Sequence, residues 1–125
     1  MFVKYFSKDD LWETFPGSKG VVLAMGEKML MYYIEYDPQR TFPEHSHPHE
    51  QVGYCVSGEG EIGIGDEVIR ILPGCGYYIP SNIKHYEKNT GNEPFICVDI
   101  FSPVRDDLAT SAFRRDYFTK SKGPK

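Results

Sequence analysis

FPEHSHPHEQVGYCVSGEGE, residues 42–61, contains three of the four histidines in the chain, at positions 45, 47 and 49. In a β-strand, residues i and i+2 face the same side, so His45 and His47 are expected to point into the same space. Two imidazoles on one face can share a metal ion. His49 has the same parity, but Pro48 and the turn that must precede the next strand are expected to break the alternation. The stretch therefore predicts a β-strand that carries two metal ligands.

Short apolar or alternating segments continue on both sides of this stretch. Strands are predicted at 20–25, 28–36, 44–48, 51–57, 59–65, 67–72, 75–79, 84–89 and 94–101. Turn residues rich in glycine and proline separate them, as in Ser57–Gly60 and Leu72–Gly74. So many short strands leave no room for helical crossovers, which excludes a parallel βαβ architecture. The pattern predicts an all-β sandwich or closed barrel.

The two ends of the chain show a different pattern. Ser7 is a plausible N-cap for a helical turn over residues 7–16, and Ser102-Pro103 could begin a short helix through Leu108-Ala109. The expected organisation is an N-terminal extension packed on the barrel (1–19), the barrel itself (20–102), and a C-terminal segment with a basic tail (103–125). The tail is best interpreted as a solvated chain end.

Composition excludes several classes of function. The 125 residues carry a net charge of −4 with no basic stripe, so nothing attracts the chain to nucleic acid by electrostatics. No apolar run has membrane-spanning length and the first residues do not resemble a signal peptide, so we expect a cytoplasmic protein without a membrane partner. Three widely spaced cysteines, an odd number, predict reduced thiols.

The fourth histidine completes a second pattern in GCGYYIPSNIKHYEKN, residues 74–89. The two patterns are His45-x-His47-x3-Gln51-x6-Gly58 and Gly74-x5-Pro80-x-Asn82-x2-His85-x3-Asn89. They resemble the paired motifs of the cupin family, whose members are small jelly-roll β-barrels that hold one metal ion. The resemblance implies a single-domain cupin barrel with His45, His47, Gln51 and His85 around one divalent transition metal ion, Ni, Zn, Mn, Fe or Co.

Two positions depart from the family pattern. Gln51 stands where glutamate is usual, and Asn82 replaces a glycine, which is mild because asparagine tolerates positive φ. Three neutral imidazoles and a neutral amide leave the charge of the ion uncompensated, which predicts a pocket that favours an anionic ligand. Whether His49 or Glu50 joins the metal ligands stays open at this stage.

The last predicted strand carries one carboxylate in an apolar run. Alternation places Cys97, Asp99 and Phe101 on one face of FICVDIF, residues 95–101. If that face is the inner one, Asp99 stands near the metal and can act as a general acid or base. Otherwise it faces water or pairs with an arginine. Arg105 also has two interpretations. Its guanidinium either binds a carboxylate at the barrel mouth or is a surface side chain.

HSHPHEQVGY together with VDIFSPVRDD resembles one cupin subgroup, the pectin- and alginate-degradation proteins of KdgF type. That group promotes the ring opening of unsaturated monouronates to linear keto acids. By position, the resemblance assigns Asp99 and Arg105 to catalysis, and Phe101 and Arg105 to substrate binding. Tyr78 in the second motif is predicted as a further substrate contact. The implied enzyme is a metal-dependent isomerase or lyase of uronate metabolism and pectin degradation.

Two other functions remain compatible with the sequence. One is a metal-containing cupin that binds or senses a ligand without turnover, because fold alone does not determine function. The other is a dioxygenase or lyase that acts on another small carboxylate, with Tyr54, Tyr77 or Tyr78 as acid–base groups.

The segment 29–36 is apolar on both faces, so its outer face needs a cover. We expect a homodimer to provide it, and a folded-back N-terminal segment with Trp12 and Phe15 is the alternative.

Overall fold

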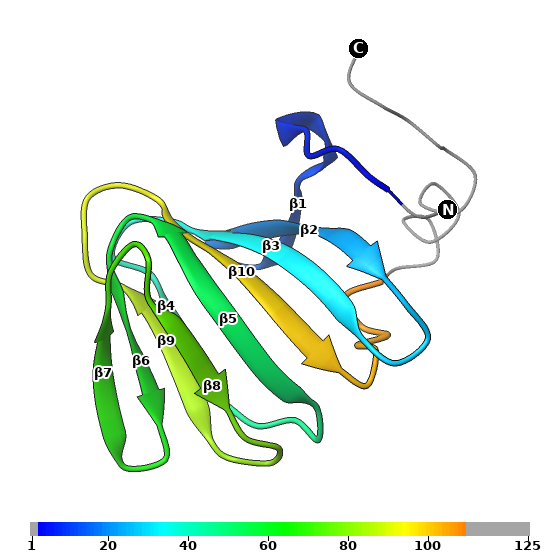
Figure 1. Ribbon diagram of the computed structural model, residues 1–125. Coiled ribbons are helices and arrows are strands. Elements are labelled where there is room, and N and C mark those ends of the chain that lie inside the picture. The colour runs from blue at the N-terminus through cyan, green and yellow to red at the C-terminus, as the bar shows by residue number, and fades with distance from the viewer. Residues whose placement is uncertain (1–2, 110–125) are drawn as a thin grey trace.

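The computed structural model describes residues 3–109, which form two antiparallel sheets facing each other (Figure 1). The strands are β1 (Trp12–Phe15), β2 (Ser18–Met25), β3 (Leu30–Tyr36), β4 (Thr41–His45), β5 (Glu50–Ser57), β6 (Gly60–Ile64), β7 (Glu67–Ile71), β8 (Gly76–Ile79), β9 (His85–Asn89) and β10 (Phe95–Ser102). The larger sheet has the order β1-β2-β3-β10-β5-β8, and the smaller has the order β4-β9-β6-β7. This confirms the predicted all-β jelly-roll architecture.

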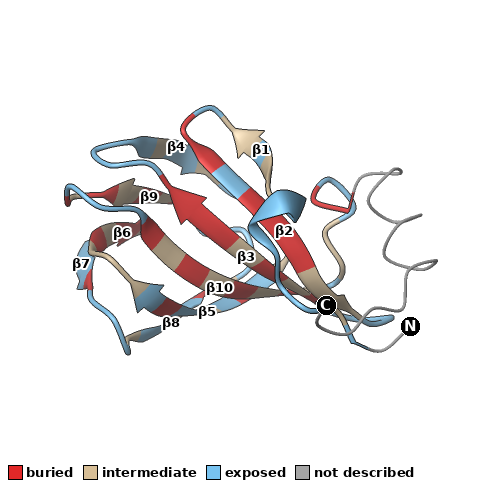
Figure 2. Cartoon of the chain, turned by 90° about the horizontal axis from the view of Figure 1, so that it is seen from above, coloured by how far each residue is buried: buried red, intermediate tan, exposed pale blue. Residues whose placement is uncertain are grey.

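Alternation of side chains builds the core between the sheets. Along β10, buried and half-buried residues alternate without interruption from Phe95 to Ser102, and Figure 2 shows the stripes of buried residues on β10 and on its neighbour β3. Cys97, Asp99 and Phe101 therefore face inward, which is the first of the two arrangements that the sequence left open. The buried apolar side chains include Val22, Leu30, Tyr32, Ile34, Ile62, Ile71, Ile79 and Phe95.

The first strand of the smaller sheet differs from its prediction at both ends. β4 covers Thr41–His45 rather than 44–48, and it pairs with β9 so that His45 lies opposite His85. β4 is an edge strand of its sheet, and an edge strand accommodates Pro43, which cannot donate a backbone hydrogen bond. His47 consequently lies in the loop after the strand, so strand alternation is not what orients it.

The N-terminal helical turn is shorter than predicted. A 3₁₀ turn spans Lys8–Asp10 with the expected cap, because the Ser7 Oγ accepts a hydrogen bond from the Asp9 backbone amide at 3.2 Å. The rest of the predicted turn is wrong, since Trp12–Phe15 is strand β1. Pairing with β2 stabilises this strand through backbone hydrogen bonds between the strands, whereas a short isolated helix is only marginally stable.

The C-terminal segment contains turns and no helix over residues 103–109, which corrects the helix suggested there. Its remainder, with the basic tail, lies outside the described residues. Within residues 3–109, no helix is both long enough and apolar enough to cross a membrane. All three cysteines are free thiols, as predicted.

The turns of the two motifs use left-handed backbone conformations where the pattern requires them. Gly58 and Gly74 have φ of 79° and 91°, and Asn82 has φ of 63°. Asparagine thus takes over the conformation of the glycine that it replaces, as predicted. The Asn82 backbone amide donates to the carbonyl of His47 at 2.8 Å, so this turn also holds the histidine loop.

Candidate metal centre and pocket

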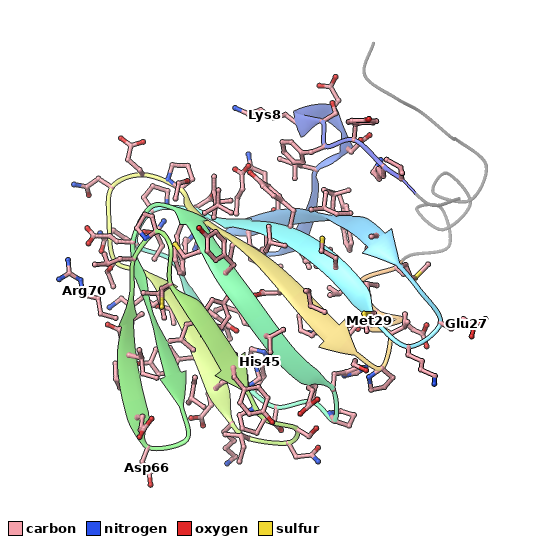
Figure 3. All side chains as sticks on the ribbon, in the orientation of Figure 1. Lys8, Glu27, Met29, His45, Asp66 and Arg70 are labelled. Carbon is pink, nitrogen blue, oxygen red and sulfur yellow. The ribbon has the colours of Figure 1, made fainter. Side chains whose placement is uncertain are left out.

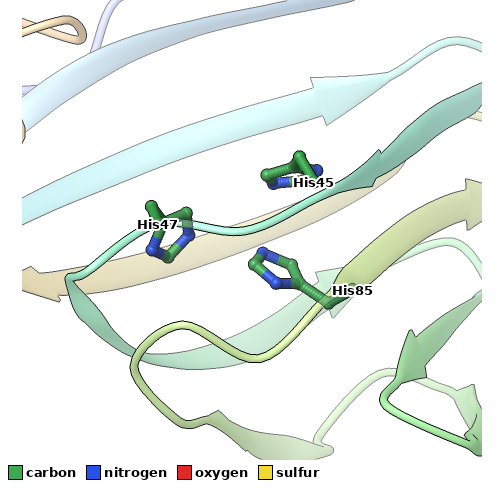
Figure 4. A group of neighbouring side chains, drawn as sticks. All are labelled: His45, His47 and His85. Carbon is green, nitrogen blue, oxygen red and sulfur yellow. The ribbon is translucent and has the colours of Figure 1, made fainter.

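Three of the four histidines converge at one end of the space between the sheets. One ring nitrogen each of His45, His47 and His85 lies within 4.8 Å of the other two (Figure 4). His45 ends β4, His47 follows in the loop, and His85 begins β9 directly opposite His45. The rings of His45 and His85 are 4.2 Å apart between centroids, and those of His47 and His85 are 4.8 Å apart.

Backbone carbonyls orient all three rings in the same way. The Nδ1 atoms lie 2.9 Å from the oxygen of Pro43 for His45, 3.0 Å from that of His49 for His47, and 2.8 Å from that of Ile83 for His85. A ring nitrogen this close to a carbonyl oxygen carries the proton, so Nε2 presents its lone pair. Metal-binding histidines are commonly held by such a bond from the other ring nitrogen.

Two features of the cluster fit a bound cation: a ring nitrogen without a partner and a pair of acceptors that face each other. The Nε2 of His85 is buried and has no hydrogen-bond partner. The Nε2 of His47 lies 3.2 Å from the Oε1 of Gln51, and with the proton on Nδ1 both atoms are acceptors. Buried acceptors that face each other are unfavourable unless a positive charge lies between them. The residues present therefore fit a divalent transition metal ion, and ring nitrogens with an amide oxygen suit several such metals.

Burial keeps these imidazoles neutral. Burial is the main reason that the pKa of His45 is lowered to about 4; the hydrogen bond to the Pro43 carbonyl opposes the shift, and the neighbouring rings and Arg105 add to it. The pKa values of His47 and His85 are lowered for the same main reason. A neutral imidazole is the form that binds metal, so at pH 7 the three rings are ready to act as ligands.

A pocket opens beside the histidines, between the two sheets. Its lining residues are Phe15, Tyr32, Ile34, Tyr36, Phe42, His45, Gln51, Glu87, Asp99, Phe101, Arg105 and Leu108. Two carboxylates, one guanidinium, one imidazole and one amide thus line a pocket whose other residues are apolar or aromatic. Such a mixture suits a small ligand that is anionic and carries hydroxyl groups.

Asp99 is buried on β10 and is held by two side chains. It accepts hydrogen bonds from the hydroxyl of Tyr77 and from Gln51. Burial raises the pKa of Asp99 to about 6, although these bonds and the charge of Arg105 oppose the rise. Tyr77 reaches Asp99 across Gly53, where an added Cβ would lie 2.2 Å from the carboxylate, so only glycine leaves room for the contact.

Arg105 belongs to the pocket rather than to the surface. Its side chain is only 12% exposed, and its guanidinium carbon lies 4.9 Å from the centre of the Phe101 ring. Asp107 binds it in bidentate fashion, with 3.1 Å to Nε and 2.5 Å to Nη2. The structure therefore brings Asp99, Phe101 and Arg105 to one pocket, whereas the pairing with Asp107 had no signal in the sequence.

Tyr78 requires a correction. Alternation along β8 turns Tyr78 outward, where it is 51% exposed and donates from its hydroxyl to Glu50 at 2.9 Å. It does not line the pocket, so its predicted substrate contact is not supported. Tyr77 is the tyrosine of this strand that faces inward.

The two residues left open as metal ligands lie outside the histidine group. Glu50 is exposed, and His49 contributes only its backbone carbonyl to the orientation of His47. Glu87 is the pocket residue that the sequence reasoning missed. The signal was present, because His85 and Glu87 are two residues apart on one strand and must share a face.

This arrangement, a two-sheet barrel that gathers three histidines beside a mixed pocket, defines a small barrel protein compatible with one metal centre. Residues 32–101 match the family model described as Cupin domain, and the chain belongs to the cupin family.

The fold resembles solved cupins over most of its length. KdgF from Halomonas sp. superimposes with a TM-score of 0.76 and 26% identity over 84% of this chain and 97% of that one. An RmlC-like cupin from Shewanella frigidimarina gives a TM-score of 0.75 at 24% identity, over 82% of this chain and 92% of that one, and supports the fold alone.

The matches to two curated relatives cover only about half of those proteins. L-ectoine synthase of Vibrio campbellii is 35% identical over 60 residues, which is 47% of either chain. H2HPP isomerase of Bacillus subtilis is 28% identical over 116 residues, 91% of this chain and 48% of that protein. The chain thus spans about half the length of these two relatives.

Proposed function

We propose that this cupin is a metal-dependent enzyme that acts on a small anionic sugar acid and opens the ring of unsaturated monouronates to linear keto acids. The observation that carries the proposal is the common pocket of Asp99, Phe101 and Arg105 beside the histidine cluster. The likeness to KdgF from Halomonas sp. supports the choice of substrate.

His45, His47, His85 and Gln51 would hold the ion. When bound, a divalent ion supplies a Lewis acid that polarises a carboxylate or hydroxyl oxygen. Because the rings are neutral at pH 7, no proton competes with the ion for their nitrogens. The amide of Gln51 adds an oxygen ligand without adding charge. An anionic substrate would therefore find a net positive charge at this end of the pocket.

Asp99 would move the proton. In the ring opening, the anomeric hydroxyl loses a proton, the bond between the anomeric carbon and the ring oxygen breaks, and the ring alkene becomes an enol. Return of a proton to the alkene carbon then gives the keto acid, so the step is an isomerisation and consumes no co-reactant. A carboxylate that is buried and fixed by Tyr77 and Gln51 is suited to such a transfer.

Arg105 and Phe101 would place the substrate. The pair with Asp107 engages Nε and Nη2 of Arg105, so Nη1 is the nitrogen that we propose for the substrate carboxylate. The Phe101 ring lines the pocket beside the guanidinium and would offer an apolar surface to the sugar ring. Asp107 keeps the guanidinium above that surface before substrate arrives.

The test is direct incubation of the metal-loaded protein with an unsaturated monouronate. We expect loss of the ring-alkene absorbance at a rate well above that of the protein treated with chelator, with equimolar appearance of the keto acid. Binding without loss of absorbance would instead indicate a ligand-binding or sensory cupin. Oxygen consumption with Fe(II) would indicate a dioxygenase. Either result would reject the proposed reaction.

We also propose a homodimer through the outer face of the larger sheet. Half-exposed or exposed apolar side chains occupy three adjacent strands of this face: Met31 and Tyr33 on β3, Ile96, Val98 and Ile100 on β10, and Val52, Tyr54 and Val56 on β5. Phe6 packs on Tyr33 at 4.3 Å between ring centroids and covers one margin of the face. A second copy would bury the remainder.

Substitution of Val52 by glutamate tests this interface. The side chain is 44% exposed, so the charge is harmless in a monomer but would be desolvated in a dimer. We expect light scattering to give twice the chain mass of 14.3 kDa for the wild type and a dissociation constant at least about tenfold weaker for Val52→Glu. Val68→Glu, at a 63% exposed position on β7, is the matched control. A monomeric wild type at micromolar concentrations would contradict the proposal.

A further inference from the structure

Glu87 is a buried carboxylate, and one of its oxygens has no hydrogen-bond partner. On β9, the residues His85, Glu87 and Asn89 are all buried and face the interior of the molecule. Asn89 is fully bonded, since its amide nitrogen donates to the carbonyls of Tyr36 and Glu93 and its oxygen accepts from the Gly91 amide. Glu87 differs, because it is only 5% exposed and its buried Oε2 has no hydrogen-bond partner. The fold therefore accounts for Asn89 but not for Glu87.

The group that faces the Glu87 carboxylate is a ring nitrogen of His85 and not a lysine or arginine side chain. The Oε1 of Glu87 lies 3.8 Å from the Nε2 of His85. His85 uses Nδ1 toward the carbonyl of Ile83, so Nε2 presents a lone pair toward the carboxylate, and this Nε2 is itself without a partner. Two buried electron-pair donors that face each other are stabilised when one cation binds both.

Distance and charge both agree with such a cation. Two atoms that each lie about 2.0–2.2 Å from one ion can be at most about 4.4 Å apart, and the observed separation of 3.8 Å is within that limit. Gln51 contributes no charge to the centre, and the second carboxylate of the pocket, Asp99, is already bonded to Tyr77 and Gln51. Glu87 is thus the pocket carboxylate that is available to the ion. It is not part of the group of three mutually close histidine nitrogens but lies beside the Nε2 of His85, so it would approach the ion from that side.

We propose that Glu87 is a carboxylate ligand of the metal centre and supplies the negative charge that Gln51 does not. The negative charge would come from β9, beside His85, instead of from the glutamine position on β5. The inference rests on the metal centre of the proposed function but not on the identity of its substrate. A resting centre with one carboxylate would carry a net charge of +1 rather than +2.

Glu87→Gln tests the proposal, because it keeps the size of the side chain and removes its charge. In competition with a chromophoric chelator, we expect the variant to bind Co²⁺ or Zn²⁺ about 10- to 100-fold more weakly than the wild type. The double variant Glu87→Gln with Gln51→Glu should recover most of the affinity, since it returns one carboxylate to the same ion. Glu50→Gln makes the same chemical change at an exposed carboxylate outside the histidine group, and we expect its affinity to stay within about threefold of the wild type.

A second readout makes the outcome independent of the stability of the variants. The visible absorption bands of bound Co²⁺ report its ligands, so they should shift in Glu87→Gln and keep the wild-type position in Glu50→Gln. Thermal melting in chelator checks that each metal-free variant is folded. Wild-type affinity together with wild-type bands in Glu87→Gln would overturn this inference alone. A wild-type protein that binds neither metal would overturn the metal centre and, with it, the proposed function.

Discussion

Asp99→Asn is expected to lower kcat for the unsaturated monouronate by about 10²- to 10⁴-fold, while the metal content stays at the wild-type level. The amide keeps the shape of the side chain and its contact with the Tyr77 hydroxyl, but it cannot accept and return a proton. Loss of alkene absorbance gives the rate, and elemental analysis of the same samples gives the metal content.

The control for Asp99→Asn is an aspartate of the same chemistry outside the pocket. Asp66 lies exposed at the tip of the turn between β6 and β7 (Figure 3) and does not line the pocket, so Asp66→Asn should leave both rate and metal content unchanged. Turnover by Asp99→Asn at the wild-type rate would exclude the proton-transfer role. Loss of metal in Asp99→Asn would show that the carboxylate serves the ion instead.

His47→Ala is expected to reduce the metal content from one ion to less than about a tenth of an ion per chain, and to remove activity with it. Structural zinc sites bind with about 10–16 kcal/mol, so one of four ligands represents roughly 3 kcal/mol, which corresponds to an affinity loss on the order of 10²-fold. Elemental analysis after gel filtration and a chelator competition would measure the two quantities.

His49→Ala is the matched control, since it removes an imidazole from the same loop two residues away. The bond that orients His47 goes to the backbone carbonyl of residue 49, which the substitution retains, and the His49 ring is outside the group of three. We therefore expect metal content close to that of the wild type. Equal losses in the two variants would mean that the loop conformation, and not the His47 nitrogen, governs binding.

The sequence identified the residues of the histidine cluster correctly, but strand alternation, the reason given for two of them, does not apply. His45 and His47 were expected to converge because of strand alternation, yet β4 ends at His45 and His47 lies in a loop. The two rings meet because a carbonyl fixes the His47 ring and the Asn82 amide holds the carbonyl of His47. The spacing of the motif identified the residues, whereas contacts with a distant turn explain their geometry.

Alternation predicted faces more reliably than partners. It placed Asp99 and Phe101 on one face of β10, and the structure confirms that this face is buried. It did not distinguish Tyr77 from Tyr78, because either could have faced inward until the pairing of β8 with β5 was known. It also left Glu87 unnoticed, because acidic side chains are seldom buried, although alternation puts Glu87 on the same face as His85.

By itself, the sequence determined the class of fold, the identity of the three clustered histidines and which residues share a face of β10. These follow from side-chain periodicity and fixed motif spacing, which are local properties of the chain. Only the tertiary structure decided that Tyr77 meets Asp99 across Gly53, that Arg105 is held by Asp107 above Phe101, and that Glu87 faces the lone pair of His85. Such neighbours depend on which strands pair and in what register, and that register is set by packing of the whole barrel rather than by any single segment.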